Sequence, residues 1–439
     1  MNRGVALTSL GAALVLGGLF EARGEELSGS VDGAPSPPAL PSWGGVLPSL
    51  PQNWSDLPVQ FRASESVGYN SNILGTPSNS SFFGNLHQGD FELISNYGGS
   101  ARANWEGQQF FIDGSYGLTR YLHDVSLNSV QNSFDAGVNW IFTSRCSGTL
   151  VGAESVSQSP FAQQVISTQA VNSVHTVSLN ETANCVISGE YSAVFNSGIN
   201  QSTNSTLANE ANNAKSKFVA AGLNYNITQT NSIQALLTIT GTEYTNRSST
   251  LNNAGLLNNL TQDQLSVTYT RQINPNLSFV VTAGLVGVVN NSSFTLAIPS
   301  AILPQYSASV TWSATPKLGV TASVGRSVSP PTTIIGNVQS TESATLGLNY
   351  LVSSKVALSA NVSTSYSAAA FTQFAPGVAT GLSPVNLTAQ KSYSAGASLS
   401  YTVTPFIGAN LSYQYTRSVQ SGLVTPQSSL MLNVNYNPH

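Results

Sequence analysis

Residues 340–372 alternate apolar and small polar side chains over two successive segments, and this period limits the possible folds more than any other feature. The apolar set includes Leu346, Leu348 and Val362, and the residues between them are mostly Thr, Gly, Asn and Ser. A period of two places alternate side chains on opposite faces of an extended strand. An apolar face opposite an uncharged polar face is typical of strands that separate lipid from a water-filled lumen.

The alternation recurs in about eighteen segments from residue 61 onward, each long enough to cross a bilayer obliquely. They lie near 60–70, 90–105, 108–122, 131–142, 146–157, 173–187, 190–200, 214–227, 231–245, 261–273, 277–289, 304–314, 317–328, 341–352, 355–369, 389–403, 406–418 and 427–436. Short turns such as Glu106-Gly107 and Thr404-Pro405 alternate with longer links rich in Asn, Ser and Thr. The sequence therefore predicts an all-β, antiparallel transmembrane barrel of the outer membrane, with short periplasmic turns and long extracellular loops.

The N-terminal region has a different composition. Residues 1–24 combine Arg3, an apolar run and the small residues Ala22 and Gly24, which predicts a secretory signal peptide. Residues 25–59 are rich in Pro, Gly and Ser, and we expect a periplasmic lead-in. Two tryptophans in this segment leave open a plug or a partner site. The barrel is expected over 60–439.

Charged residues make up only 8% of the chain, and the formal net charge is −4. This balance argues against nucleic acid as a partner. Aromatic residues gather where strands are expected to end, which predicts one aromatic belt at each membrane interface. Near the short turns these are Trp105, Phe110, Trp140, Phe142, Tyr225, Tyr269, Phe279, Trp312, Tyr350, Tyr401, Phe406 and Tyr436, and near the long links Tyr69, Tyr116, Phe195, Phe218, Tyr244, Tyr306, Tyr366, Tyr393 and Tyr413.

The two cysteines, Cys146 and Cys185, lie almost equidistant from the centre of the link between their strands. In an antiparallel hairpin such residues face each other, and the periplasm is oxidising, so we expect a disulfide. Two free thiols are the alternative.

Four cations are expected on lipid-facing positions just beyond the aromatic belt near the long links: Arg120, Lys217, Arg326 and Arg417. At that height they would meet lipopolysaccharide phosphates, whereas ordinary interfacial snorkelling is the simpler reading. Glu243 at a similar position weakens the pattern.

The alternation places Arg102, Asp113 and Asp135 on lumen-facing positions, among hydroxyl and amide side chains. They are either solvated wall residues or the charges of a weakly selective pore whose walls suit sugar chains. The four histidines are scattered, and we find no catalytic, cofactor or metal-ligating motif. The sequence predicts a protein that is not an enzyme.

The run FRASESVGYNSNILGTP, followed by a polar link and GDFEL, resembles the first hairpin of the beta-barrel porin 2 group, which includes outer-membrane proteins found with exopolysaccharide biosynthesis systems. The likeness is sharpest over 60–160, around the Gly68-Tyr69-Asn70-Ser71-Asn72 motif. The resemblance implies a barrel of porin size and, for some members, a role in polysaccharide export. It implies no catalytic residues.

Three functions fit these patterns: a channel for polysaccharide or small polar solutes, a non-conducting barrel with a structural or adhesive role through its loops, and a secreted β-solenoid. A solenoid needs a repeat of fixed length, and none is visible. The expected partners are outer-membrane lipid and lipopolysaccharide, the barrel-assembly machinery, and polysaccharide or periplasmic export components. The last segment supports assembly because it resembles the C-terminal recognition strand of outer-membrane proteins, although Asn437, Pro438 and His439 extend beyond it.

Overall fold

The computed structural model of the chain describes residues 59–74, 87–159, 172–246, 259–290, 301–329, 338–369, 389–420 and 423–437. The predicted signal peptide and nearly all of the lead-in lie outside these ranges. Val59, placed in the lead-in by the sequence, opens the first strand.

All eighteen predicted segments are strands, including the one expected near 173–187. Their bounds are β1 (Val59–Asn70), β2 (Asp90–Trp105), β3 (Gln108–Tyr121), β4 (Ser129–Thr143), β5 (Cys146–Gln158), β6 (Ser173–Val186), β7 (Tyr191–Asn204), β8 (Ala214–Thr228), β9 (Asn231–Tyr244), β10 (Asn259–Asn274), β11 (Leu277–Asn290), β12 (Ala301–Thr315), β13 (Leu318–Ser329), β14 (Gln339–Leu351), β15 (Val356–Ala369), β16 (Gln390–Thr404), β17 (Ile407–Gln420) and β18 (Leu423–Tyr436).

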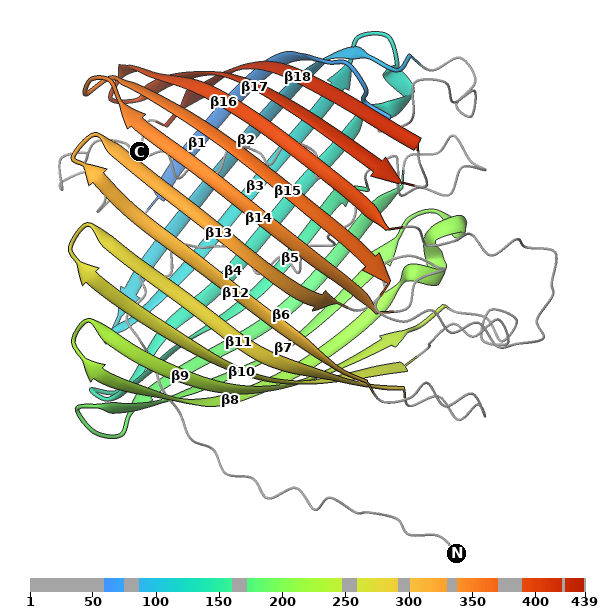
Figure 1. Cartoon of the computed structure of the whole chain (residues 1–439). Helices are drawn as coiled ribbons and strands as arrows, with labels where there is room; N and C mark the ends of the chain where they lie inside the picture. Colours follow the sequence, from blue (N-terminus) through green and yellow to red (C-terminus); the bar gives the residue numbers. More distant parts are fainter. Residues whose placement is uncertain are drawn as a thin grey trace, which may run out of the picture.

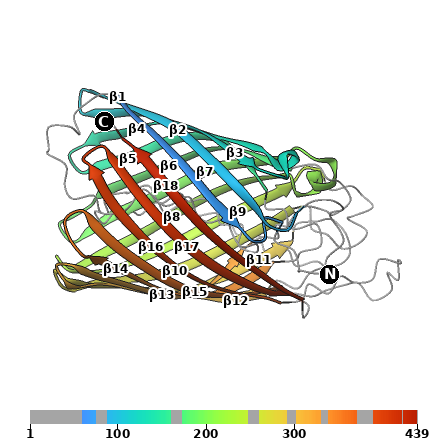
Figure 2. The ribbon, with the colours of Figure 1, turned by 90° about the horizontal axis from the view of Figure 1, so that it is seen from above.

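The strands form one closed sheet, because each pairs in antiparallel fashion with its neighbours in the chain and β1 pairs with both β2 and β18. Figures 1 and 2 show the tilted strands running round a closed cylinder. Closure gives every strand two partners, so no sheet edge is left with unpaired N–H and C=O groups. The fold is an all-β, closed, 18-stranded antiparallel barrel.

The outer face of the cylinder is apolar along most of each strand. On β18, Leu430, Leu432, Val434 and Tyr436 point outward and are 44–50% exposed, while the alternate residues point into the barrel. Across β14 and β15 the register sets Leu346 opposite Val362 on the outside. Within the described residues, no other part of the chain covers this apolar outer face. Lipid hydrocarbon is the environment in which such a face is stable.

The two ends of the barrel differ, and we call them the short-turn end and the long-link end. Turns of two residues join six of the eight strand pairs at the short-turn end, and links of four residues join β6 to β7 and β14 to β15. In the Glu106-Gly107 turn both residues have positive φ (49° and 83°). That backbone matches the right-handed twist of the hairpin, and Gly adopts it without steric cost. At the opposite end, the link between β17 and β18 is shorter than predicted. Both strands extend further than the sequence indicated, and only residues 421–422 separate them.

Two short 3-10 helices, η1 (Val125–Leu127) and η3 (Leu207–Asn212), lie in links at the long-link end. Leu127 of η1 packs with Ile73 and Leu74, so the links after β1 and β3 share a small apolar cluster beside Tyr121. Within the described ranges, no helix has the length and apolar composition needed to cross a membrane.

The two faces of one strand provide a direct test. Val362→Arg places a cation on the outer face at mid-strand, where the loss of folding free energy in a bilayer is expected to be about 2–4 kcal/mol. Ser363→Arg, the matched control, turns its side chain into the lumen and loses only the hydroxyl bond to Ser394, about 0.5–1.5 kcal/mol. Urea unfolding in liposomes measures both, and equal losses would contradict the assignment of faces.

Candidate functional site in the barrel lumen

The inner wall consists mainly of hydroxyl and amide side chains that bond one another across neighbouring strands. Examples are Ser115–Ser133 (2.7 Å), Ser216–Thr242 (3.0 Å), Thr268–Thr282 (3.0 Å), Ser359–Ser398 (2.6 Å), Ser363–Ser394 (2.7 Å), Asn410–Ser400 (2.8 Å) and Asn433–Ser66 (2.6 Å). Each hydroxyl in such a pair keeps further capacity to donate or accept. These pairs therefore offer hydrogen bonds to a polar molecule without themselves carrying charge.

Charge on the inner wall is confined to one side of the barrel. Within the described strands, every Asp, Glu, Lys and Arg on the inner face belongs to β1–β4, and the corresponding residues of β5–β18 lie on outer-face positions. The inner charged residues are Arg62, Asp90, Glu92, Arg102, Asp113 and Asp135. The three lumen charges predicted from the sequence are all in this set.

Arg62 and Asp113 of this set form a bidentate salt bridge. Two guanidinium nitrogens of Arg62 donate to the two carboxylate oxygens of Asp113, at 2.8 and 2.5 Å. Arg62 reaches β3 by crossing β2 above Gly98, where a Cβ would come within 2.7 Å of its Nε. Asp135 lies directly opposite Asp113 on β4 and interacts electrostatically with Arg62. One cation thus serves two carboxylates.

Arg102 lies further toward the short-turn end of β2, opposite Phe111. No hydrogen bond or ion pair of the Arg102 side chain occurs within the described residues. Phe111 also faces the lumen and lies over Gly137, whose missing Cβ would come within 2.6 Å of the ring. The side chains of Arg102 and Phe111 therefore add a cation and an aromatic surface to the same part of the wall.

Arg62 was not among the lumen charges predicted from the sequence, although alternation along β1 places it on the inner face. Glu65 was also not among the predicted residues. It lies on the outer face of β1 and accepts hydrogen bonds from Ser95 Oγ (2.7 Å) and Tyr97 Oη (2.6 Å). The strand pairing that brings these partners together is not visible in the sequence.

The four predicted cations, Arg120, Lys217, Arg326 and Arg417, lie on outer-face positions toward the long-link end. Arg326 is not independent, because its Nη1 lies 3.8 Å from Glu342 and its Nε donates to Ser340. Glu342, Lys215 and Lys391 also lie in this region and were not among the residues predicted from the sequence. The ammonium of Lys391 lies 5.8 Å from the centre of the Tyr366 ring.

Most predicted belt residues point outward, but Phe218 and Tyr244 do not. Phe218 lies on the inner parity of β8, with its ring over Gly198, and Tyr244 is buried. The neighbouring residues Val219 and Glu243 point outward. Because side chains alternate along a strand, moving one position along the chain changes a belt position into a lumen position. The expectation for these two aromatics was wrong.

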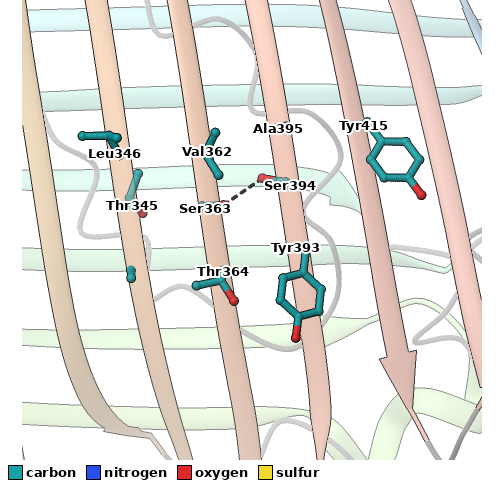
Figure 3. A pocket seen from close by; sticks show the side chains of 10 residues that line it. Thr345, Leu346, Val362, Ser363, Thr364, Tyr393, Ser394, Ala395 and Tyr415 are labelled. Carbon is teal, nitrogen blue, oxygen red and sulfur yellow. Dashed lines mark hydrogen bonds between the residues drawn. The ribbon is translucent and has the colours of Figure 1, made fainter.

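A shallow apolar groove crosses the outer face of β14–β17 (Figure 3). Its floor includes the small residue Ala395, and Tyr393 and Tyr415 project beside it. The register sets Tyr393 next to Arg417, so the groove ends beside a cation. This combination suits an acyl chain with an anionic headgroup.

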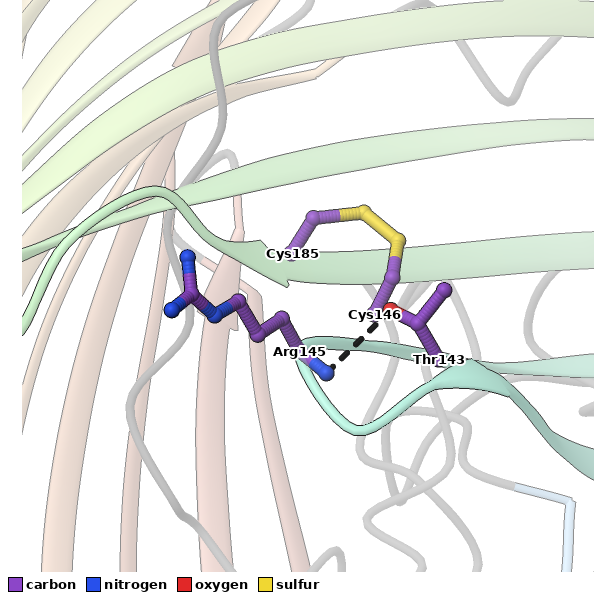
Figure 4. The surroundings of a disulfide bond; sticks show 4 residues. All are labelled: Thr143, Arg145, Cys146 and Cys185. Carbon is purple, nitrogen blue, oxygen red and sulfur yellow. Dashed lines mark hydrogen bonds between the residues drawn. A yellow bond between two sulfur atoms is a disulfide. The ribbon is translucent and has the colours of Figure 1, made fainter.

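Cys146 and Cys185 are direct partners in the β5–β6 register, on the outer face at the short-turn end. Their sulfur atoms face each other in the arrangement of a disulfide, with Thr143 at the end of β4 and Arg145 of the adjoining turn beside them (Figure 4). The facing arrangement agrees with the hairpin argument from the sequence, and the covalent bond remains a prediction for measurement.

Comparisons with known proteins give a likeness of architecture. No family model matches the sequence, and no curated protein matches it. Similar solved structures include OccK11 (OpdR) of Pseudomonas aeruginosa (12% identity, 86% of this chain and 95% of that chain, TM-score 0.45) and OpdL of the same organism (10%, 87% and 99%, 0.45). The FrpB iron transporter of Neisseria meningitidis is a further example (11%, 83% and 62%, 0.47). These values assign neither a substrate nor a residue role, and the resemblance to the beta-barrel porin 2 group stays a prediction.

The disulfide is tested by mass spectrometry of the purified, non-reduced protein. We expect a mass lower than that of the reduced protein by two hydrogen atoms, and no alkylation before reduction. Cys146→Ser provides the control, since Cys185 should then become alkylatable without reductant. Two reactive thiols in the untreated wild-type protein would contradict the bond.

Proposed function

We propose that the protein is an outer-membrane channel that lets polar solutes pass through its lumen. The observation that carries this proposal is the closed cylinder of eighteen strands with an apolar exterior and a hydroxyl- and amide-rich interior. Barrels of this strand number enclose an aqueous space wide enough for solutes unless a segment fills it. Its predicted location is the Gram-negative outer membrane, with the short-turn end in the periplasm.

The lining favours small, uncharged polar solutes, with carbohydrate as the best-matched class. Hydroxyl pairs such as Ser359–Ser398 and Ser363–Ser394 can exchange hydrogen bonds with sugar hydroxyls at little cost. The same lining would also suit a polysaccharide chain, and we include export of such a chain in the proposal. A non-conducting barrel with an adhesive role is the alternative that the experiment below distinguishes.

The test is conductance of the purified protein in planar bilayers together with uptake of neutral sugars by proteoliposomes. We expect stable conductance steps, sugar uptake, and weak preference between K⁺ and Cl⁻. Added polysaccharide should reduce the current if long chains enter the lumen. If folded barrels show no conductance and no sugar uptake, that result would contradict the channel.

A substitution among the inner charges of β1–β4 tests whether these charges influence ion selectivity. Arg62→Gln leaves Asp113 and Asp135 without their shared cation, so permeability should shift toward cations. A unit charge about 7 Å from an ion in water contributes about 0.6 kcal/mol, or roughly a threefold change in the permeability ratio. Lys317→Gln, in a turn outside the strands, is the matched control and should leave the reversal potential unchanged.

The exterior cations extend the proposal to the surrounding lipid. Arg120, Lys217 and Arg417, with Arg326 partly neutralised by Glu342, would contact lipopolysaccharide phosphates at the extracellular interface. The groove beside Arg417 supports this, because it can take an acyl chain of the same lipid.

Charge reversal of these four residues to Glu should lower the lipopolysaccharide that co-purifies with folded barrels several-fold, since each cation near an anionic surface contributes about 1 kcal/mol. Reversal of Arg145, Lys317 and Lys355 at the short-turn end is the control and should have no such effect. Unchanged lipid content in the first variant would refute the contacts.

A further inference from the structure

Two histidines from different links meet at the long-link end, where sequence analysis found only scattered residues. His87 precedes β2 and His123 follows β3, and their ring centres lie 5.2 Å apart. Their side chains are more than half exposed, whereas those of their partners Asp124 and Asp90 are 4% and 0% exposed. The site thus combines two accessible imidazoles with two buried carboxylates.

Each histidine is held by one aspartate in the same way. Asp124 accepts the backbone N–H of His87 at 2.8 Å and lies 3.1 Å from its Nδ1. Asp90 accepts the backbone N–H of His123 at 2.9 Å and lies 2.8 Å from its Nδ1. Asp90 also accepts the backbone N–H of Asp124 at 2.9 Å, so the two halves are linked.

This arrangement sets the tautomer of both rings. A carboxylate is an acceptor, so each Nδ1 carries the proton and donates it, and the lone pair of the neutral ring is on Nε2. Within the described residues, neither Nε2 has a hydrogen-bond partner. Histidines that ligate metals typically have their second ring nitrogen bound to a carboxylate in this manner, which orients the ring and raises its basicity.

The separation of the rings also fits one shared ion. With metal–nitrogen distances near 2.0–2.1 Å and a tetrahedral angle, two imidazoles that bind one ion place their ring centres about 5 Å apart. We propose that His87 and His123 bind a divalent transition-metal ion of the Zn²⁺, Cu²⁺ or Ni²⁺ type through Nε2, with Asp124 and Asp90 as positioning residues.

Water or a solute donor would complete the coordination. Within the described ranges, no group of three or more His, Cys, Asp or Glu side chains is arranged to hold a metal, so the described residues supply the two imidazoles alone. Imidazole ligands favour Zn²⁺, Cu²⁺ and Ni²⁺ over Ca²⁺ and Mg²⁺, which prefer oxygen. Binding should therefore discriminate between these two sets of ions.

The test is calorimetric titration of Zn²⁺ into the folded, detergent-solubilised full chain without a polyhistidine tag. We expect saturable binding of one ion per chain, no comparable binding of Mg²⁺, and at least about tenfold weaker Zn²⁺ binding in the His87→Ala/His123→Ala double variant. His175→Ala is the matched control, because His175 is also paired with a carboxylate, Glu154, but has no second histidine beside it among the described residues. It should bind as the wild type does.

A second measurement needs no variant. Electron paramagnetic resonance of the wild-type protein with one equivalent of Cu²⁺ should show coupling to two imidazole nitrogens. Heat-modifiability on a gel verifies that each variant is folded. Zn²⁺ affinity unchanged in the folded double variant, or a Cu²⁺ spectrum without imidazole coupling, would overturn the proposal. Both readouts are independent of conductance.

Discussion

The backbone hydrogen-bond ladder that closes between β1 and β18 is the interaction on which the rest of this structure depends. In hydrocarbon an unpaired N–H or C=O costs several kcal/mol, so an open edge could not persist there. The pairing runs from Ala63 with Tyr436 to Asn70 with Ser429, and it joins the two ends of the sheet. Once closed, the alternation of side chains assigns every residue to the lumen or to the exterior. The chemistry of both faces follows from that assignment.

Local sequence was sufficient for the strands and their faces because a period of two is a property of neighbouring residues. It gave all eighteen strands, the inward direction of Arg102, Asp113 and Asp135, and the facing positions of Cys146 and Cys185. It failed at Phe218 and Tyr244, where proximity to a strand end was used instead of parity. The face of a residue near a strand end depends on its place in the alternation, so proximity alone gave the wrong side.

Contacts across strands could not be predicted, since they depend on register and on the shape of the links. The salt bridge between Arg62 and Asp113 needs β2 to present Gly98 at the crossing point. The meeting of His87 and His123 needs the links after β1 and β3 to pack together, which the cluster of Ile73, Leu74 and Leu127 accomplishes. Separations of 36 or 51 residues along the chain give no indication of such proximity.

The confinement of inner charges to β1–β4 gives the lumen an electrical direction. Carboxylates and guanidinium groups stand on one wall, and the inner faces of β5–β18 carry uncharged hydroxyl, amide and aliphatic side chains. The resulting field has a component across the cylinder, between the charged strands and the rest of the wall. A dipolar molecule crossing this barrel would therefore be rotated into a preferred orientation as it travels, with one edge toward the charged strands.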